Sequence, residues 1–209
     1  MTSKIHSSPY GAVLCDLDNV IRFYDTSRVA ELERAAGLAE GATAKVAYAR
    51  ETDMPLLLGQ IAQHQWVESI VLGLTGGGQV SQAQARELAT ALATAPFRAD
   101  QPVVALLRRV RAHLPLVLVT NATPELENDL ASLGLADLAD HVVSSARVGV
   151  AKPDPRIYEI AAERAGVPMD RCLFVDDRLE NIEAAVALGM TGVLFREPAD
   201  IRASLSFLA

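Results

Sequence analysis

The sequence is poor in aromatic residues and cysteine, carries no excess of positive charge and has no long apolar run. Aromatic residues make up 5% of the 209 positions although 50% of the chain is hydrophobic, so the core must be mostly aliphatic. An aliphatic core favours helices packed on aliphatic strands over an aromatic-rich β-sandwich. A chain of this length holds one large domain, or one domain that carries a sizeable insertion.

The two cysteines, Cys15 and Cys172, lie far apart, and each is inside an apolar run. Buried free thiols in a reducing compartment are the simplest interpretation of this pattern. Cys15 stands next to Asp16, but the alternation of side chains along a strand would turn the two residues to opposite faces. We therefore expect no catalytic role for Cys15.

The formal net charge of -7 argues against a general nucleic-acid binder, because such proteins normally carry a basic face. No apolar run is long enough to span a bilayer. The first ten residues lack the apolar core of a secretory signal, so we interpret them as a loose arm. These observations predict a cytoplasmic protein without a nucleic-acid or membrane partner, and they leave open whether it is a monomer or a homodimer.

Strand and helix signals alternate through much of the chain. Short apolar runs predict strands over residues 11–15, 116–119, 141–143, 172–175 and 192–195. Apolar residues at helical spacing, between cap and stop signals, predict helices over residues 103–113, 124–133, 155–165 and 181–188. This alternation predicts an α/β fold, in which a parallel sheet with right-handed crossovers is flanked by helices.

The segment of residues 22–100 differs in character, because it is rich in good helix formers and contains almost no strand-like run. Three helices are expected there, over residues 27–36, 61–74 and 82–95. The third is opened by a capping-box pattern at Ser81 and Gln84 and closed by Pro96. The sequence therefore predicts a helical subdomain inserted after the first strand.

Polar groups follow three of the expected strands, and a lysine lies in a loop ahead of a capped helix. These residues are Asp16, Asp18, Thr120, Asn121, Asp176, Asp177 and Lys152. The carboxyl ends of parallel strands lie along one edge of a sheet, so the side chains can converge. Carboxylates suit Mg²⁺, and lysine and threonine can bind phosphate. The pattern indicates a magnesium and phosphate site, although D-x-D taken alone is more typical of an Asp-rich turn.

Four segments resemble the motifs of the haloacid dehalogenase-like hydrolases, and they appear in that family's order. They are residues 13–21, residues 117–121, Lys152-Pro153 and residues 174–181. The chain looks most like the subgroup with a small helical cap, which contains sugar-phosphate phosphatases and the phosphatase domain of soluble epoxide hydrolase. The resemblance implies a Rossmann-like catalytic core of residues 1–21 and 101–209, with residues 22–100 as the helical cap.

The resemblance also implies a role for each polar residue. Asp16 would be the nucleophile, forming an aspartyl-phosphate, and a metal ligand. Asp18 would protonate the leaving alcohol and then deprotonate the hydrolytic water, while its backbone carbonyl binds Mg²⁺. Thr120 and the backbone of Asn121 would hold the transferring phosphoryl group, and Lys152 would neutralise both nucleophile and phosphate.

The acid pair after the fourth expected strand allows two assignments. Asp177 aligns with the family's metal ligand, because Asn181 then falls at the usual spacing. Asp176 would then position Lys152 or a metal-bound water. The opposite order of the two acids stays open.

The function implied by the resemblance is Mg²⁺-dependent hydrolysis of a small phosphorylated metabolite, for example a sugar phosphate. Asp18 favours phosphoester hydrolysis over dehalogenation, because a leaving alcohol needs a proton and a leaving halide does not. Dehalogenases of the family typically lack this second acid and need no magnesium. Two alternatives stay open: a phosphomutase of the same family, and a catalytically silent phosphate- or metal-binding module on the same fold.

Two further residues have more than one interpretation. Arg22 follows the first motif closely and would either meet substrate anions or lie in a solvated hinge. Trp66 lies on an expected helix of the insertion, where it would line the substrate mouth or, as we prefer, pack within the insertion. No residue of the insertion identifies the substrate.

Overall fold

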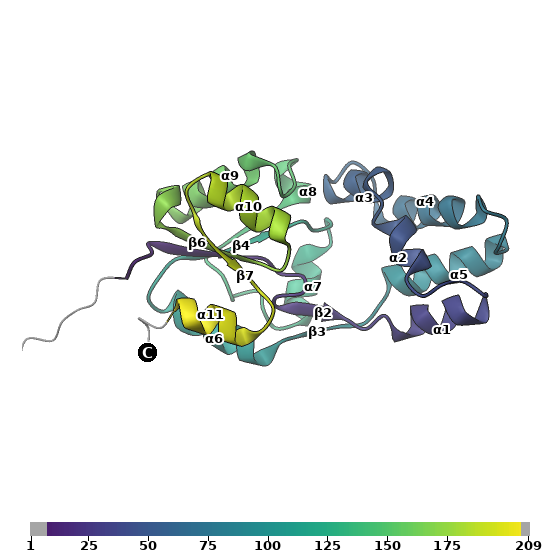
Figure 1. Cartoon of the computed structure of the whole chain (residues 1–209), viewed down its shortest axis with the longest axis horizontal. Helices are drawn as coiled ribbons and strands as arrows, with labels where there is room; N and C mark the ends of the chain where they lie inside the picture. Colours follow the sequence, from purple (N-terminus) through teal and green to yellow (C-terminus); the bar gives the residue numbers. More distant parts are fainter. Residues whose placement is uncertain (1–7, 206–209) are drawn as a thin grey trace, which may run out of the picture. The chain divides into compact units, whose positions relative to one another are not determined.

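Figure 1 shows the computed structural model of the protein, which describes residues 8–205. The chain divides into two compact units, one of Met1–Phe23 with Ala99–Ala209 and one of Tyr24–Arg98. Two short strands, β2 (Arg22–Tyr24) and β3 (Phe97–Ala99), connect the units and pair with each other. Neither strand is expected from the sequence, because three residues are too few to give a pattern.

The first unit is built on a sheet of five parallel strands, which confirms the predicted α/β fold. The order across the sheet is β5-β4-β1-β6-β7. The strands are β1 (Ala12–Cys15), β4 (Leu116–Thr120), β5 (His141–Ser144), β6 (Cys172–Asp176) and β7 (Thr191–Leu194). Cys15 at the end of β1 lies opposite Leu118 and Val175, so β1, β4 and β6 end at one edge.

Helices cover both faces of this sheet (Figure 1). On one face lie α9 (Pro155–Ala165) and α10 (Leu179–Ala187). On the other lie α6 (Gln101–Arg111), α7 (Leu126–Ser132) and α11 (Pro198–Ser204). The short elements α8 (Ser145–Val148) and η1 (Met169–Arg171) complete the unit. This arrangement buries all four residues of β1, as expected for a central parallel strand.

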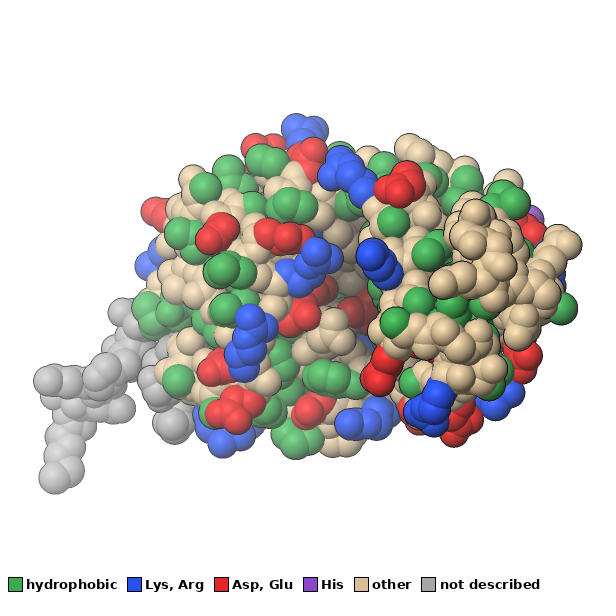
Figure 2. Space-filling view, turned by 45° about the vertical axis from the view of Figure 1, so that its right-hand side comes forward, with side chains coloured by type: hydrophobic (Ala, Val, Ile, Leu, Met, Phe, Trp, Pro, Cys, Tyr) green, Lys and Arg blue, Asp and Glu red, His purple; other side chains and the backbone are tan. Residues whose placement is uncertain are grey.

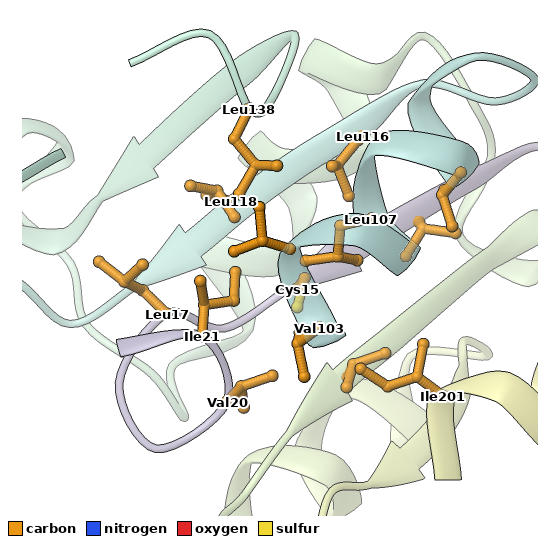
Figure 3. Close-up of a cluster of buried hydrophobic side chains, with 14 of the residues drawn as sticks. Cys15, Leu17, Val20, Ile21, Val103, Leu107, Leu116, Leu118, Leu138 and Ile201 are labelled. Carbon is orange, nitrogen blue, oxygen red and sulfur yellow. The ribbon is translucent and has the colours of Figure 1, made fainter. Parts of the chain in front are cut away.

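Side-chain alternation along β1 supplies two separate cores. Val13 and Cys15 belong to the cluster under α6 and α11, most of whose side chains appear in Figure 3. Ala12 and Leu14 belong to the cluster under α9 and α10. Cys15 is therefore a core residue, and burial raises the pKa of its thiol well above the ordinary value. The next residue along, Asp16, turns to the α9 face.

Cap signals placed α9 correctly and α7 incorrectly. At α9, Asp154 Oδ1 accepts a hydrogen bond of 2.9 Å from the Arg156 N–H, and Pro155 is the first helical residue. The Thr123-Pro124 pair predicted a helix from residue 124, but α7 begins at Leu126. Thr123 instead accepts a hydrogen bond from the Glu125 N–H and forms a turn before the helix. The same kind of side-chain to main-chain hydrogen bond thus stabilises a turn at Thr123 and a helix start at Asp154.

The second unit contains five helices among the described residues: α1 (Ser27–Ala35), α2 (Ala42–Ala47), α3 (Arg50–Leu57), α4 (Gln63–Thr75) and α5 (Gln82–Ala93). Three of them match the expected helices. The other two, α2 and α3, were not predicted, because α2 has only 6 residues and α3 contains Pro55. Trp66 packs in the core of this unit and donates from Nε1 to the Ala47 carbonyl, which confirms its preferred interpretation.

Charged side chains of both signs are interspersed over the face that Figure 2 shows. Several form exposed ion pairs, such as that of Arg28 NH2 with Glu87 Oε1 at 3.0 Å. Exposed pairs of this kind contribute little to stability. Among the helices of residues 8–205, none combines the length and apolar character needed to cross a membrane.

Candidate active site

A buried ionic cluster lies where β1 and β6 end. Lys152 Nζ is 2.7 Å from Asp16 Oδ1 and 2.7 Å from Asp176 Oδ2. The side chains of Lys152, Asp16 and Asp176 are 2%, 8% and 0% exposed. Burying charges is costly, and one ammonium group leaves two carboxylates incompletely neutralised. A further cation near these carboxylates would therefore be electrostatically favourable.

The pKa values in this cluster follow from burial and from the neighbouring charges. Burial raises the pKa of Asp16 to about 7, with Lys152 acting in the opposite direction and the charge of Asp176 adding to the rise. Burial alone would lower the pKa of Lys152, but the two carboxylates reverse this and raise it. Lys152 therefore stays a cation beside Asp16.

Asn121, at the end of β4, fixes the main chain of Lys152. Its Nδ2 donates to the Lys152 carbonyl at 3.0 Å, and its Oδ1 accepts from the Lys152 N–H at 2.7 Å. Lys152 Nζ also lies 5.8 Å from the centre of the Phe174 ring in β6. The sequence pointed to the backbone of Asn121 and gave no sign of this side-chain clamp, which joins residues 31 positions apart.

Asp176 is held by several donors besides Lys152. Asn181 Nδ2 lies 2.9 Å from its Oδ1 and 3.1 Å from its Oδ2, and the Arg178 N–H donates to Oδ1 at 2.9 Å. The Tyr158 hydroxyl in turn donates to the Asn181 carbonyl at 3.0 Å. Asp176 thus directs one oxygen to Lys152 within a hydrogen-bonded framework.

Asp177 is half-buried, and within residues 8–205 fewer hydrogen-bond donors contact its carboxylate than contact that of Asp176. Its Oδ2 accepts a hydrogen bond of 3.2 Å from Asn19 Nδ2, and burial together with the charge of Asp176 raises its pKa. One carboxylate oxygen each from Asp16, Asp176 and Asp177 lie within 4.8 Å of one another. Carboxylate oxygens at such spacing suit a hard divalent cation. The donor set therefore fits magnesium.

Thr120 lies at the end of β4 and is buried, yet its hydroxyl has no hydrogen-bond partner among residues 8–205. A buried polar group without a partner is unfavourable, so such a hydroxyl is suited to bind a ligand. Serine and threonine hydroxyls both donate and accept, which matches a phosphate oxygen. The orphaned hydroxyl is consistent with the predicted phosphate contact.

Asp18 lies outside the group of three acids. Its carboxylate contacts Arg22, with Nε 2.6 Å from Oδ1 and NH2 3.0 Å from Oδ2. Arg22 also places NH1 2.6 Å from Asp129 Oδ2 on α7. Since the Arg22 side chain is 4% exposed, the solvated-hinge interpretation was wrong. Sequence reasoning missed Asp129, which lies 107 positions away.

A model of the haloacid dehalogenase-like hydrolases matches residues 10–189, a range that includes every predicted site residue. The chain belongs to this family. Its fold is also that of a HAD family enzyme from Bacteroides thetaiotaomicron, solved in complex with magnesium and inorganic phosphate. That likeness has a TM-score of 0.67 at 19% identity and covers 90% of this chain and 94% of the other.

Curated relatives of this haloacid dehalogenase-like hydrolase include phosphatases and a dehalogenase. Phosphatase MT3486 of Mycobacterium tuberculosis is 46% identical over 65 residues, covering 31% of this chain and 30% of the relative. The sesquiterpene phosphatase astK of Aspergillus oryzae is 32% identical over 102 residues, with coverage of 48% and 52%. An (S)-2-haloacid dehalogenase of Pseudomonas putida is 36% identical over 73 residues, with coverage of 34% and 33%. These matches span at most about half of each relative's length.

Proposed function

We propose that this hydrolase is a Mg²⁺-dependent phosphatase that cleaves a small phosphorylated metabolite through an aspartyl-phosphate on Asp16. The buried cluster of Asp16, Lys152 and Asp176 carries the proposal. It holds a carboxylate in place beside a cation, at a strand end where two further acids are near. The orphaned Thr120 hydroxyl gives independent support for an anionic ligand.

Asp16, Asp177 and the backbone carbonyl of Asp18 would hold the metal. When bound, Mg²⁺ would neutralise charge on the phosphoryl oxygens and on the nucleophile. The contacts of Asp176 with Lys152, Asn181 and Arg178 favour it as the acid that orients Lys152. Asp177, whose carboxylate accepts a hydrogen bond of 3.2 Å from Asn19 Nδ2 and lies outside Lys152's two ion pairs, is the better candidate for direct metal binding.

In the first step, an Asp16 oxygen attacks phosphorus and the bond from phosphorus to the ester oxygen breaks. Asp18 gives its proton to that leaving oxygen, so an alcohol departs. Lys152 balances the charge of Asp16 and of the phosphate, while the Thr120 hydroxyl and the Asn121 N–H hold phosphoryl oxygens. Splitting hydrolysis in this way replaces one difficult step with two easier ones.

In the second step, Asp18 takes a proton from water as the water oxygen attacks phosphorus. The bond from phosphorus to Asp16 breaks, which releases inorganic phosphate and restores the carboxylate. The net reaction consumes one ester and one water and yields one alcohol and one phosphate. Asp18 acts as acid and then as base, so each turnover returns it to its starting state.

Asp18 separates this proposal from dehalogenation, which the Pseudomonas putida relative represents. A halide leaves without a proton, so a dehalogenase has no chemical need for an acid at this position. The presence of Asp18 two residues after Asp16 therefore supports phosphoester hydrolysis. Release of halide from a 2-haloacid, with no phosphatase activity, would favour the dehalogenase.

The proposal is tested by measuring phosphate release from p-nitrophenyl phosphate and a panel of sugar phosphates. We expect turnover with Mg²⁺, loss of turnover with EDTA, and a loss of at least about 1,000-fold in Asp16→Asn. Glu183→Gln, at an exposed position on α10, is the matched control and should keep wild-type activity. Full activity of Asp16→Asn, or equal turnover in EDTA, would refute the proposal.

A further inference from the structure

Arg22 is a buried cation that none of the family motifs explains. It binds two carboxylates, Asp18 through Nε and NH2 and Asp129 through NH1. The two contacts to Asp18 form a bidentate pair at 2.6 and 3.0 Å. A bidentate arginine contact fixes the plane and direction of a carboxylate as well as balancing its charge. Arg22 therefore sets the orientation of the Asp18 side chain.

The main chain of Arg22 closes the turn that carries Asp18. Its N–H donates to the Leu17 carbonyl at 2.8 Å, and its carbonyl accepts from the Asn19 N–H at 2.8 Å. Asn19 has a φ of 60°, a left-handed conformation that asparagine adopts more readily than most residues. Arg22 thus holds Asp18 through both its side chain and its main chain.

Asp129 anchors Arg22 on a different element. It lies on α7, which Leu126 and Leu130 fix in the hydrophobic core. The contact between Arg22 NH1 and Asp129 Oδ2 is 2.6 Å. If a buried arginine has a single acidic partner, the position of its guanidinium group depends on that partner. Asp129 therefore gives the guanidinium a second ionic contact, on a helix that is anchored in the hydrophobic core.

We propose that Arg22, anchored by Asp129, is the positioning residue for Asp18. The proposal rests on the proposed phosphatase function, in which Asp18 exchanges a proton with the leaving oxygen and then with water. Each carboxylate oxygen has two lone-pair sites, so Arg22 leaves one site on each oxygen for that exchange. A misplacement of about 1 Å can cost a catalytic step about 100-fold, so loss of the guanidinium should impair proton transfer.

The test compares two substrates that differ in their need for a proton. p-Nitrophenolate leaves as a stable anion, whereas an alkoxide leaves poorly without a proton. In Arg22→Met, we expect kcat/KM for glycerol phosphate to fall by roughly 10- to 100-fold, and for p-nitrophenyl phosphate by much less. The ratio kcat/KM reports the steps up to alcohol release, so the later role of Asp18 as a base does not obscure the comparison.

Further variants separate positioning from general damage. Arg22→Lys should recover only part of the glycerol phosphate activity, because lysine cannot form the bidentate contact. Asp129→Asn should show the same selective loss to a smaller degree. Arg111 lies on α6 and pairs with Asp140. Its replacement in Arg111→Met should leave both activities unchanged. A structure of Arg22→Met should show the Asp18 carboxylate displaced, a result that needs no turnover.

The outcomes distinguish this inference from the function on which it rests. The positioning role alone would be overturned if the wild-type enzyme is active and Arg22→Met loses activity on both substrates equally, loses activity on neither, or gains activity. A wild-type enzyme that turns over no phosphate ester in the panel would overturn the proposed function, and this inference with it. A selective loss on glycerol phosphate, measured at a temperature where the variant is fully folded, supports the inference.

Discussion

The proposed chemistry depends on a few charged residues whose burial is costly for the stability of the folded chain. Lys152, Asp16 and Asp176 place three ionisable groups out of water with only one positive charge among them. Apolar residues of similar volume at such positions are often at least as stable as an ion pair. The cluster is therefore better explained by a function than by the requirements of folding.

Replacement of Lys152 tests this view. Lys152→Met leaves Asp16 and Asp176 facing each other without a cation, and we expect unfolding to become easier by about 3–5 kcal/mol. Mg²⁺ should recover part of this loss, because it supplies positive charge to the same carboxylates. Urea unfolding with and without Mg²⁺ measures both effects. Lys45→Met, at an exposed position on α2, is the control, and a loss for Lys152→Met no larger than that of the control would contradict the account.

Sequence reasoning found the residues that lie directly on the strand ends. Asp16, Thr120 and Asp176 could be predicted to share one edge, because parallel strands end together. The contact of Arg22 with Asp129 could not be predicted, because it joins a turn to a helix 107 positions away. The side-chain clamp of Asn121 on Lys152 escaped for the same reason. Contacts between loops and helices depend on packing, which a local pattern does not record.

At the scale of elements, the order of strands and helices in the first unit follows from short-range signals. Aliphatic runs predicted β1, β4, β5, β6 and β7, the helical spacing of apolar residues predicted α6, and the cap at Asp154 predicted α9. In the second unit, Ser81 Oγ and the Gln84 side chain cap α5 as expected. The helices α2 and α3 escaped prediction because tertiary packing, not local pattern, supports them: Ala47 and Leu56 reach the same core as Trp66.

Asp140 shows how one side chain fixes the start of an element, and it gives a pH-dependent prediction. Its Oδ2 accepts from the Leu116 N–H at the start of β4, at 2.9 Å, and its Oδ1 pairs with Arg111. The bond from Leu116 and the pair with Arg111 lower the pKa of Asp140 below 3.8. We expect Asp140→Ala to destabilise the protein by about 1 kcal/mol at neutral pH.

The sign of the pH dependence follows from the lowered pKa. The contribution of Asp140 is fully present above its unfolded pKa near 3.8 and is lost as pH falls through the lower folded value. Urea unfolding of wild type and Asp140→Ala should therefore differ at pH 6 and converge in strong acid. Asp137→Ala, an exposed position in the same loop, should match wild type throughout. A gap between wild type and Asp140→Ala that widens in acid would contradict the assignment.

At the scale of the whole molecule, the fold and the family are shared by enzymes with different reactions. The match over residues 10–189 includes β1 with Asp16 after it, the loop of Lys152, and the acid pair Asp176 and Asp177. Relatives with the names phosphatase and dehalogenase both match parts of the chain. We therefore expect individual residues to decide the activity, above all Asp18 and the acids that suit a cation.

In the proposed reaction the phosphoryl group passes through Asp16, and direct detection of that intermediate tests this step. Asp18→Asn should still accept the phosphoryl group from p-nitrophenyl phosphate, whose leaving group needs no proton, but should lack the base for the second step. After acid quench and proteolysis, mass spectrometry of this variant should find the phosphoryl group on the peptide that contains Asp16, at Asp16 itself. Phosphate release by the wild-type enzyme with no phosphorylated Asp16 in the variant, or with phosphorylation at another residue, would contradict the account.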